Sequence, residues 1–251
     1  ANTDSEATPE EEVKVTNNTN LGDAIFRAIA DDSYSRGEAD ISVTGLLDPP
    51  RKATLETELS HLLMEDASDL ARPFIGKAVH WYIWWSAISA LVMILFDALR
   101  RWDVAAVREA WSRIASALSN LNDNRRLFME VNGWTISGQT DNYLDGVVAD
   151  YKTPSVNEWK FGLKKEREQQ LNCYAELLRV NGFEVTALKA CLIFVDYSPR
   201  RAIYEKNYPP ASIVEVDVPL WPSGVARAFI EERVALHQKA SKRRLEQAMA
   251  D

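Results

Sequence analysis

The chain has 251 residues, 46% hydrophobic and 26% charged, which is typical of a globular protein long enough for one sizeable domain. Its net charge of −8, from 37 acidic and 29 basic residues, argues against a protein that holds nucleic acid by bulk positive charge. The two cysteines, Cys173 and Cys191, are too few for a disulfide scaffold or a four-cysteine metal site, so the expected compartment is a reducing cytoplasm.

The first half of the chain is predicted to be mainly helical. Residues 1–20 are polar, acidic and aperiodic, so we expect a disordered acidic tail that is not a signal peptide. Short helices are predicted over 21–31 and 54–69, with an extended segment that ends at Pro49-Pro50 between them. We expect residues 21–251 to form a single domain, with a helical part (21–122) followed by a sheet with flanking helices (123–251).

The next predicted helix is unusually apolar. The run from Trp81 to Phe96 is interrupted only by Ser86 and Ser89. Crossing a bilayer takes about 20 apolar residues, so the pattern favours a helix buried on most sides or covered by a partner subunit. A homo-oligomer is therefore plausible, and the alternative is a membrane or assembly anchor. The helix is predicted to end at Arg100-Arg101, before another amphipathic helix.

Two hairpins are predicted in the second half. Asn132-Gly133 and Asp145-Gly146 each separate strand-like runs, and such dipeptides suit a type I′ turn, which needs positive φ at both central residues. The first hairpin pairs Glu130 with Thr135. Since Thr135 lies six residues before Asp141, roughly 20 Å along an extended strand, Glu130 is expected to be solvated.

The second hairpin gathers charged residues. With Asp145-Gly146 as the turn, Asp141 lies opposite Asp150, and Lys152 shares their face while Tyr151 points to the other. Two carboxylates about 5 Å apart repel, so a divalent cation with oxygen ligands is the natural occupant of the space between them. The alternative is a solvated polar hairpin whose charges only keep it soluble.

The remaining elements predict a mixed sheet. A helix from about Glu166 to Val180 would carry Gln170 and Tyr174 on one face. The apolar run from Thr186 to Val195 predicts a central strand parallel to the preceding one, because a helical crossover joins them. The residues between these segments are predicted as loops, and the chain ends with an edge strand (213–218) and a long helix (223–249).

Three motifs occur in a characteristic order: G-x-x-D, then D-x-K, then Q-x-x-x-Y. This order resembles the RecB-like branch of the PD-(D/E)XK nuclease superfamily, with phage and prophage exonuclease-type members the nearest. The resemblance spans roughly residues 40–240 and implies an α/β fold with a restriction-endonuclease-like core. That core is an α-β-β-β-α-β mixed sheet flanked by helices, with extra helices at both ends of the chain. The motif residues are Gly138, Asp141, Asp150, Lys152, Gln170 and Tyr174.

The resemblance implies a hydrolase that cleaves phosphodiester bonds, a Mg²⁺- or Mn²⁺-dependent exonuclease serving phage recombination or DNA repair. Asp141, Asp150 and Lys152 would be catalytic. The metal ligands would be Asp141, Asp150, the Tyr151 carbonyl and His80, where His80 rests on the resemblance alone. The implied partners are DNA and a recombinase or annealing protein.

Substrate contacts are expected from the helix and the loop before it. The resemblance turns Gln170 and Tyr174 toward the site, although both could simply pack over the sheet. Lys160, Lys164 and Lys165 precede this helix, where phosphate contacts would be useful, or they form a solvated face. The alternative function is that of a catalytically inactive module on the same fold that binds DNA ends, and the intact Asp-Asp-Lys set argues against it.

Overall fold

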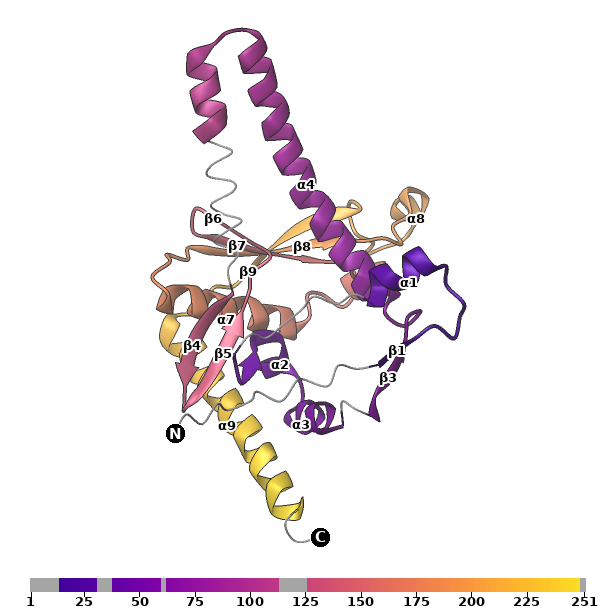
Figure 1. The fold of residues 1–251 in the computed structure, drawn as a ribbon, viewed down its shortest axis with the longest axis vertical. Coiled ribbons are helices and arrows are strands. Elements are labelled where there is room, and N and C mark those ends of the chain that lie inside the picture. The colour runs from indigo at the N-terminus through magenta and orange to yellow at the C-terminus, as the bar shows by residue number, and fades with distance from the viewer. Residues whose placement is uncertain (1–13, 31–37, 60–61, 113–125, 249–251) are drawn as a thin grey trace, which may run out of the picture. The chain divides into compact units, whose positions relative to one another are not determined.

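The computed structural model describes residues 14–30, 38–59, 62–112 and 126–248 (Figure 1). The chain divides into two compact units. Unit 1 comprises 1–34, 48–74 and 236–251, and unit 2 comprises 35–47 and 75–235. This division does not follow the expected boundary between residues 122 and 123, because unit 1 combines segments from both ends of the chain.

Unit 1 contains a two-stranded parallel ladder, β1 (Lys14–Thr16) with β3 (Met64–Asp66). The prediction of a disordered tail is wrong for β1, and residues 1–13 lie outside the described residues. Its helices are α1 (Asp23–Ala30) and α3 (Pro50–Glu58). The predicted helix over 54–69 is partly wrong: α3 starts earlier, because Pro50 suits the first helical position, and β3 replaces its second half.

The Asp66 carboxylate joins the two strands of this ladder. It accepts hydrogen bonds from the backbone N–H of Asn18 (2.6 Å) and the hydroxyl of Ser68 (2.7 Å). Several donors lower the pKa of Asp66 to about 2, and the hydrogen bond from the Ser68 hydroxyl has the largest effect. Hydrogen bonds to one carboxylate therefore stabilise a ladder that buries little apolar surface.

Unit 2 begins with a three-stranded sheet in the order β2–β5–β4. Strand β5 (Trp134–Gly138) lies in the middle, parallel to β2 (Ile41–Ser42) and antiparallel to β4 (Leu127–Val131). Glu130 pairs with Thr135, as predicted, and is exposed.

A second sheet of unit 2 has the order β6–β7–β8–β9. These strands are β6 (Asn142–Leu144), β7 (Val147–Lys152), β8 (Ala187–Ile193) and β9 (Ile213–Val218). The central pair β7–β8 is parallel and both outer pairs are antiparallel, which confirms the predicted crossover and edge strand. The protein is thus an α/β fold with mixed sheets flanked by helices.

Both predicted hairpin turns are confirmed. Asn132-Gly133 have φ values of 51° and 77°, and Asp145-Gly146 have 48° and 82°. Asn142 pairs with Ala149 and Leu144 with Val147, which is the register deduced from the Asp-Gly turn.

The predicted three-strand meander is wrong in one respect. Its middle strand breaks after Gly138 and resumes at Asn142, so that β5 and β6 belong to different sheets. The break lets the chain pass from one side of helix α7 (Lys165–Val180) to the other.

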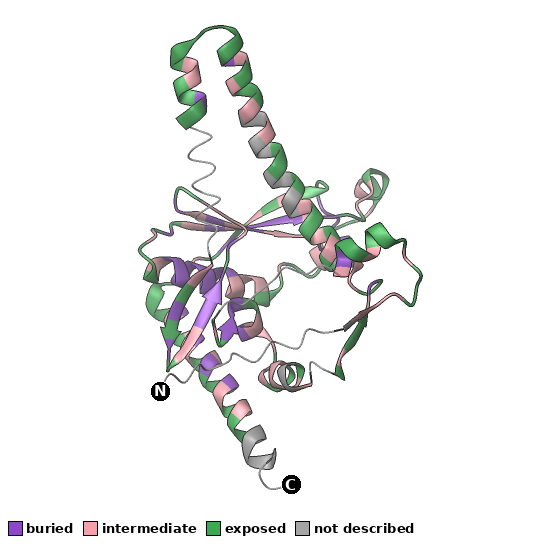
Figure 2. Ribbon diagram, viewed as in Figure 1, coloured by how far each residue is buried: buried purple, intermediate pink, exposed green. Residues whose placement is uncertain are grey.

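Helix α7 lies at the centre of the core (Figures 1 and 2). Leu171, Ala175 and Leu178 pack with the β6–β9 sheet. Cys173 and Leu177 pack with the β2–β5–β4 sheet and with helix α9 (Ser223–Ala248). Eight consecutive residues of α7, from 171 to 178, are buried, so the helix is enclosed on all sides.

Two polar residues of this enclosed helix are satisfied by the segment before α9. The Asn172 side chain donates to the carbonyl of Pro219 (2.9 Å) and accepts from the backbone N–H of Trp221 (2.7 Å). The Ser223 hydroxyl donates to the Glu176 carboxylate (2.8 Å). Polar positions on α7 therefore fix the chain that leads into α9 without leaving these buried groups unpaired.

Three short helices occupy segments that we expected to be extended or loops. They are α2 (Val43–Leu47), α6 (Val156–Trp159) and α8 (Pro199–Tyr204). Helix α8 has a recognisable start: the Ser198 hydroxyl accepts from the N–H of Arg201, and Pro199 occupies the first turn.

Helix α4 (Ala71–Arg100) contains the apolar run, and the prediction of burial on most sides is wrong for its described side chains. Tyr82 and Met93 are more than two-thirds exposed, and Phe96 is 63% exposed. In the described parts of the chain, no helix combines the length and apolar character that crossing a bilayer requires. Coverage by a partner subunit stays a prediction.

Replacing Gly146 with alanine is expected to destabilise the protein more than the same change at Gly133. Both residues hold the second central position of a hairpin turn at positive φ, so each alanine carries a strain of about 1–2 kcal/mol. A Cβ at Gly146 would also lie 2.9 Å from the Thr186 hydroxyl, whereas one at Gly133 would have no neighbour within 4 Å. Urea denaturation of both variants measures the difference, and equal losses would show that the Thr186 contact costs nothing.

Candidate active site

The D-x-K residues lie at the carboxyl end of β7. In the parallel ladder, Asp150 pairs with Ala190 and Lys152 with Leu192, and their side chains share the sheet face that α7 covers. Ligand sites in parallel sheets commonly form beyond the carboxyl ends of the strands, where the following helix begins.

Asp150 is buried, with 3% of its surface exposed. Its Oδ1 atom accepts a hydrogen bond from the Lys152 ammonium at 2.9 Å, while Oδ2 is inaccessible and has no hydrogen-bond partner among the described residues. Burial raises the pKa of Asp150 to about 6; the neighbouring Asp141 charge adds to the rise and Lys152 opposes it. Keeping the buried Asp150 ionised therefore costs free energy, because the charged carboxylate has lost its contact with water.

Asp141 lies next to Asp150, at the point where the β6–β7 ladder stops. Its Oδ2 atom accepts the backbone N–H of Tyr151 at 2.8 Å, in the place where a strand carbonyl would otherwise bond. Since the N–H and C=O of one strand residue point to the same side, the Tyr151 carbonyl faces the Asp141 side of β7. The predicted proximity of the two carboxylates is thus present, although regular pairing ends one residue short of Asp141.

The Q-x-x-x-Y residues of α7 face the same site. The Gln170 amide donates to the Tyr174 phenol (3.3 Å) and to the Thr44 hydroxyl (3.4 Å). Burial raises the pKa of Tyr174, and the negative charge of Asp150 raises it further, so the phenol keeps its proton within electrostatic reach of that carboxylate. The structure therefore places Tyr174 within electrostatic reach of Asp150, and Gln170 is hydrogen-bonded to Tyr174.

Gly138 permits this approach. A Cβ atom at this position would lie 2.8 Å from Leu177, 2.9 Å from Val43 and 3.0 Å from the Tyr174 ring. The glycine of the G-x-x-D motif thus has a packing role: it lets β5, α2 and α7 meet directly before the chain reaches Asp141.

The residues present fit a hard divalent cation. The Asp150 Oδ2 atom has no hydrogen-bond partner among the described residues, the Asp141 charge acts on the same carboxyl, and the Tyr151 carbonyl faces the Asp141 side of β7. Among the described residues, no three His, Cys, Asp or Glu side chains gather into a metal-binding group, so water would complete the coordination. His80 belongs to α4, but its side chain lies outside the described residues.

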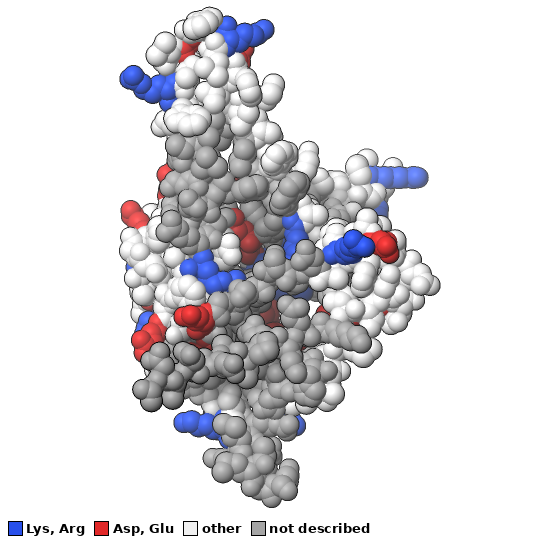
Figure 3. Space-filling view, viewed as in Figure 1, with Lys and Arg blue, Asp and Glu red and all other residues white. Residues whose placement is uncertain are grey.

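The predicted phosphate-binding lysines have other partners. Lys160 pairs with Glu205 and Lys164 pairs with Glu158, each at 3.2 Å. Lys165 is exposed at the first residue of α7. Charges of both signs are interspersed on the face drawn in Figure 3. The structure thus gives Lys160 and Lys164 a tethering role, and their contact with DNA stays a prediction.

Sequence reasoning missed Thr44 and Asp196. Thr44 lies 126 positions before Gln170, in a segment that we expected to be extended. Asp196 accepts the backbone N–H of Val156 at 2.9 Å and so caps α6 from a distant loop. Neither contact has a signal in the local sequence, because each depends on how β7, α7 and β8 are arranged.

Replacing Gly138 with alanine is expected to destabilise unit 2 by about 1–3 kcal/mol, because the new methyl must displace three side chains in a packed core. It should also shift Tyr174 away from Asp150. Thermal denaturation measures the loss, with Gly224→Ala as control because a Cβ there would meet nothing within 4 Å. Full stability of the Gly138 variant would show that α7 can retreat without cost.

Comparisons with known proteins add little to this geometry. No protein-family model matches the chain. No curated protein matches it either. One solved structure, described as the crystal structure of SSO0001, is similar, with a TM-score of 0.48 and 16% identity over 84% of each chain. A likeness at this level does not indicate a shared activity, so function has to be inferred from the site itself.

Proposed function

We propose that this protein is a metal-dependent nuclease that hydrolyses phosphodiester bonds in DNA. The observation that carries the proposal is the buried Asp150 carboxylate, whose Oδ2 atom has no partner among the described residues and lies beside Asp141. Folding alone gains nothing from placing the half-buried Asp141 carboxylate beside the buried Asp150 carboxylate, whereas a divalent cation would stabilise both.

Each residue then has a chemical role. A bound Mg²⁺ or Mn²⁺ would polarise the phosphate and lower the pKa of a water molecule. Asp141 and Asp150 would hold the ion, with the Tyr151 carbonyl as a further oxygen ligand. Lys152 is held by Asp150 and would stabilise the negative charge that develops as water adds to phosphorus and the P–O bond to the departing nucleotide breaks, with the departing oxygen taking a proton from solvent. Tyr174 and Gln170 would orient these groups or contact the strand.

The finer assignment is to the RecB-like branch of the PD-(D/E)XK superfamily, as an exonuclease acting in phage recombination or DNA repair. It is supported by the meeting of all three motifs around the end of β7, with the glycine, the carboxylates and the Q-x-x-x-Y face in mutual contact or electrostatic reach. DNA and a recombinase or annealing protein would be the partners, in the cytoplasm.

The test compares end-labelled linear DNA with closed circular DNA in Mg²⁺, Mn²⁺ or EDTA. Loss of linear DNA that requires a metal, while circles survive, is the expected result. Cleavage of closed circles as well would support a nuclease but contradict the proposal that it is an exonuclease. If no metal supports cleavage and the folded protein still binds DNA ends, the protein is a binding module.

A further inference from the structure

A pocket of about 210 Å³ lies on the same sheet face as the candidate active site. Its walls come from the segment after β7 and from strands β8 and β9. They are mainly apolar, and the principal lining residues are Pro154, Trp159, Leu163, Leu192, Phe194 and Val216. None of these residues belongs to the catalytic set.

The pocket adjoins Lys152. Leu192, which lines it, is the direct partner of Lys152 in the β7–β8 ladder, and neighbouring strands lie about 4.8 Å apart. Pro154, another wall residue, follows Lys152 by two positions. A DNA strand that has a phosphate bound at Lys152 would therefore bring an adjacent nucleotide to the mouth of the pocket.

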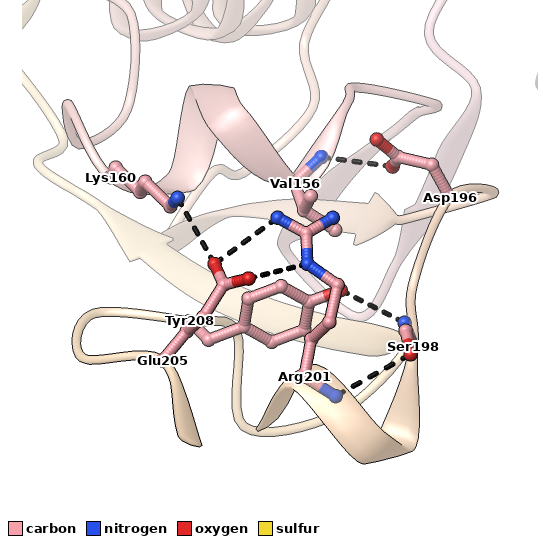
Figure 4. A network of polar contacts seen from close by, with 7 residues as sticks. All are labelled: Val156, Lys160, Asp196, Ser198, Arg201, Glu205 and Tyr208. Carbon is pink, nitrogen blue, oxygen red and sulfur yellow. Dashed lines mark hydrogen bonds and ion pairs between the residues drawn. The ribbon is translucent and has the colours of Figure 1, made fainter. Parts of the chain in front are cut away.

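Helix α6, which forms one wall, is held firmly in place (Figure 4). Asp196 accepts the N–H of Val156 at 2.9 Å, and Lys160 and Arg201 converge on the Glu205 carboxylate from different elements. On the inner side, the Trp159 ring meets Phe194 edge to face at 6.0 Å. These contacts pre-form the pocket, which lowers the entropic cost of filling it.

The chemistry of the walls selects an uncharged, flat occupant. Glu158 is the charged residue in the lining, and it already pairs with Arg167 at 2.6 Å and with Lys164 at 3.2 Å. The described residues of this lining include no lysine or arginine that could hold a phosphate. A nucleobase has apolar faces that pack on Trp159 and aliphatic side chains, and it is tethered to the phosphate at Lys152.

We propose that this pocket receives one nucleobase of the strand being cut, next to the scissile phosphate. A base inside a duplex is stacked on both faces and paired at its edge, so it enters such a pocket only after leaving the helix. The pocket thus makes the protein select a strand that is unpaired at this nucleotide. The inference rests on the proposed nuclease function and names its substrate class as single-stranded.

The test uses a single-stranded oligonucleotide and matched oligonucleotides with one abasic nucleotide at successive positions. One position is expected to lower kcat/KM by about 5- to 150-fold, the loss that corresponds to one base–aromatic contact. Val216→Phe, which fills the pocket from β9, should lower kcat/KM on the normal strand by a similar factor and cause no further loss on that abasic strand. Val214→Phe is the matched control, on the same strand and face but outside the pocket lining.

The outcomes separate the two proposals. Cleavage that is indifferent to abasic positions, or equal losses for the Val216 and Val214 variants on both strands, would overturn the pocket and leave the nuclease standing. If the wild type cuts nothing, binding of the same oligonucleotides is measured by fluorescence anisotropy. If one abasic oligonucleotide binds more weakly than the normal one, and Val216→Phe removes that difference in affinity, the pocket is supported without the nuclease. Equal binding of all oligonucleotides would overturn the pocket.

Discussion

Replacing Lys152 with alanine is expected to lower the rate of DNA cleavage by about 100- to 1,000-fold, because the transition state loses a preorganised positive charge. The substitution also leaves the Asp150 carboxylate, which is buried and bonded to Lys152 at 2.9 Å, without its counter-ion. Some loss of stability should accompany the loss of rate. Initial rates on end-labelled linear DNA at saturating Mg²⁺ measure the effect.

Two further variants separate chemistry from folding. Lys189→Ala removes a lysine of the adjacent strand β8 that pairs with Glu215 on the other face of the sheet, and it should leave the rate unchanged. Lys152→Arg keeps the charge beside Asp150 and so protects the fold, but its planar guanidinium presents that charge in a different geometry and should restore little activity. Full activity of a folded Lys152→Ala variant would remove the residue from the catalytic set.

Replacing Asp150 with asparagine is expected to abolish metal-dependent cleavage and, without metal, to stabilise the protein at pH 7.5. Lys152 can still donate to the amide oxygen, and the amide nitrogen takes the place of the proton that Asp150 would share with Asp141. Asparagine removes the free-energy cost of keeping Asp150 ionised in the folded protein. That cost raises the pKa of Asp150 to about 6 and is on the order of 1–3 kcal/mol.

The sign of the pH dependence follows from this raised pKa. Between about pH 4 and 6 the folded wild type binds more protons at Asp150 than the unfolded chain does, so its stability in EDTA should fall as the pH rises through this window. The Asp150→Asn variant lacks this contribution, and the gap between the two proteins should widen toward pH 7.5.

Urea denaturation at pH 5 and 7.5, with EDTA or Mg²⁺, gives both readouts. Mg²⁺ should raise the stability of the wild type at pH 7.5 and leave the variant nearly unchanged, because the ion binds only the folded carboxylate pair. A variant that is less stable than the wild type in EDTA at both pH values would mean that the Asp150 charge itself stabilises the fold, so that no cation would be needed to explain the two carboxylates.

Local signals in the sequence predicted most of the hairpin that carries Asp150 and Lys152. The Asp145-Gly146 dipeptide specifies a turn, and strict alternation along a strand then places Asp150 and Lys152 on one face. The crossover to β8 was predictable for a similar reason, since a continuous apolar run after a helix indicates a buried parallel strand.

The features that were missed depend on packing between distant segments. The break between β5 and β6 comes directly after Gly138, which lies close to Leu177 and Val43, and no local pattern encodes that approach. Thr44 reaches Gln170 only after β2 has joined the edge of β5. The exposure of the α4 side chains was likewise invisible, because an apolar run does not reveal what it packs against.

The two-residue turn between β6 and β7 also limits how this chain can vary in length. One extra residue between Asp141 and the turn would move Asp141 to the opposite face of the strand and carry its carboxylate away from the Tyr151 N–H that it caps. An insertion should be tolerated better at the exposed Lys206-Asn207, between α8 and the edge strand β9. The spacing of nine positions from Asp141 to Asp150 is therefore set by the hairpin geometry of the candidate active site.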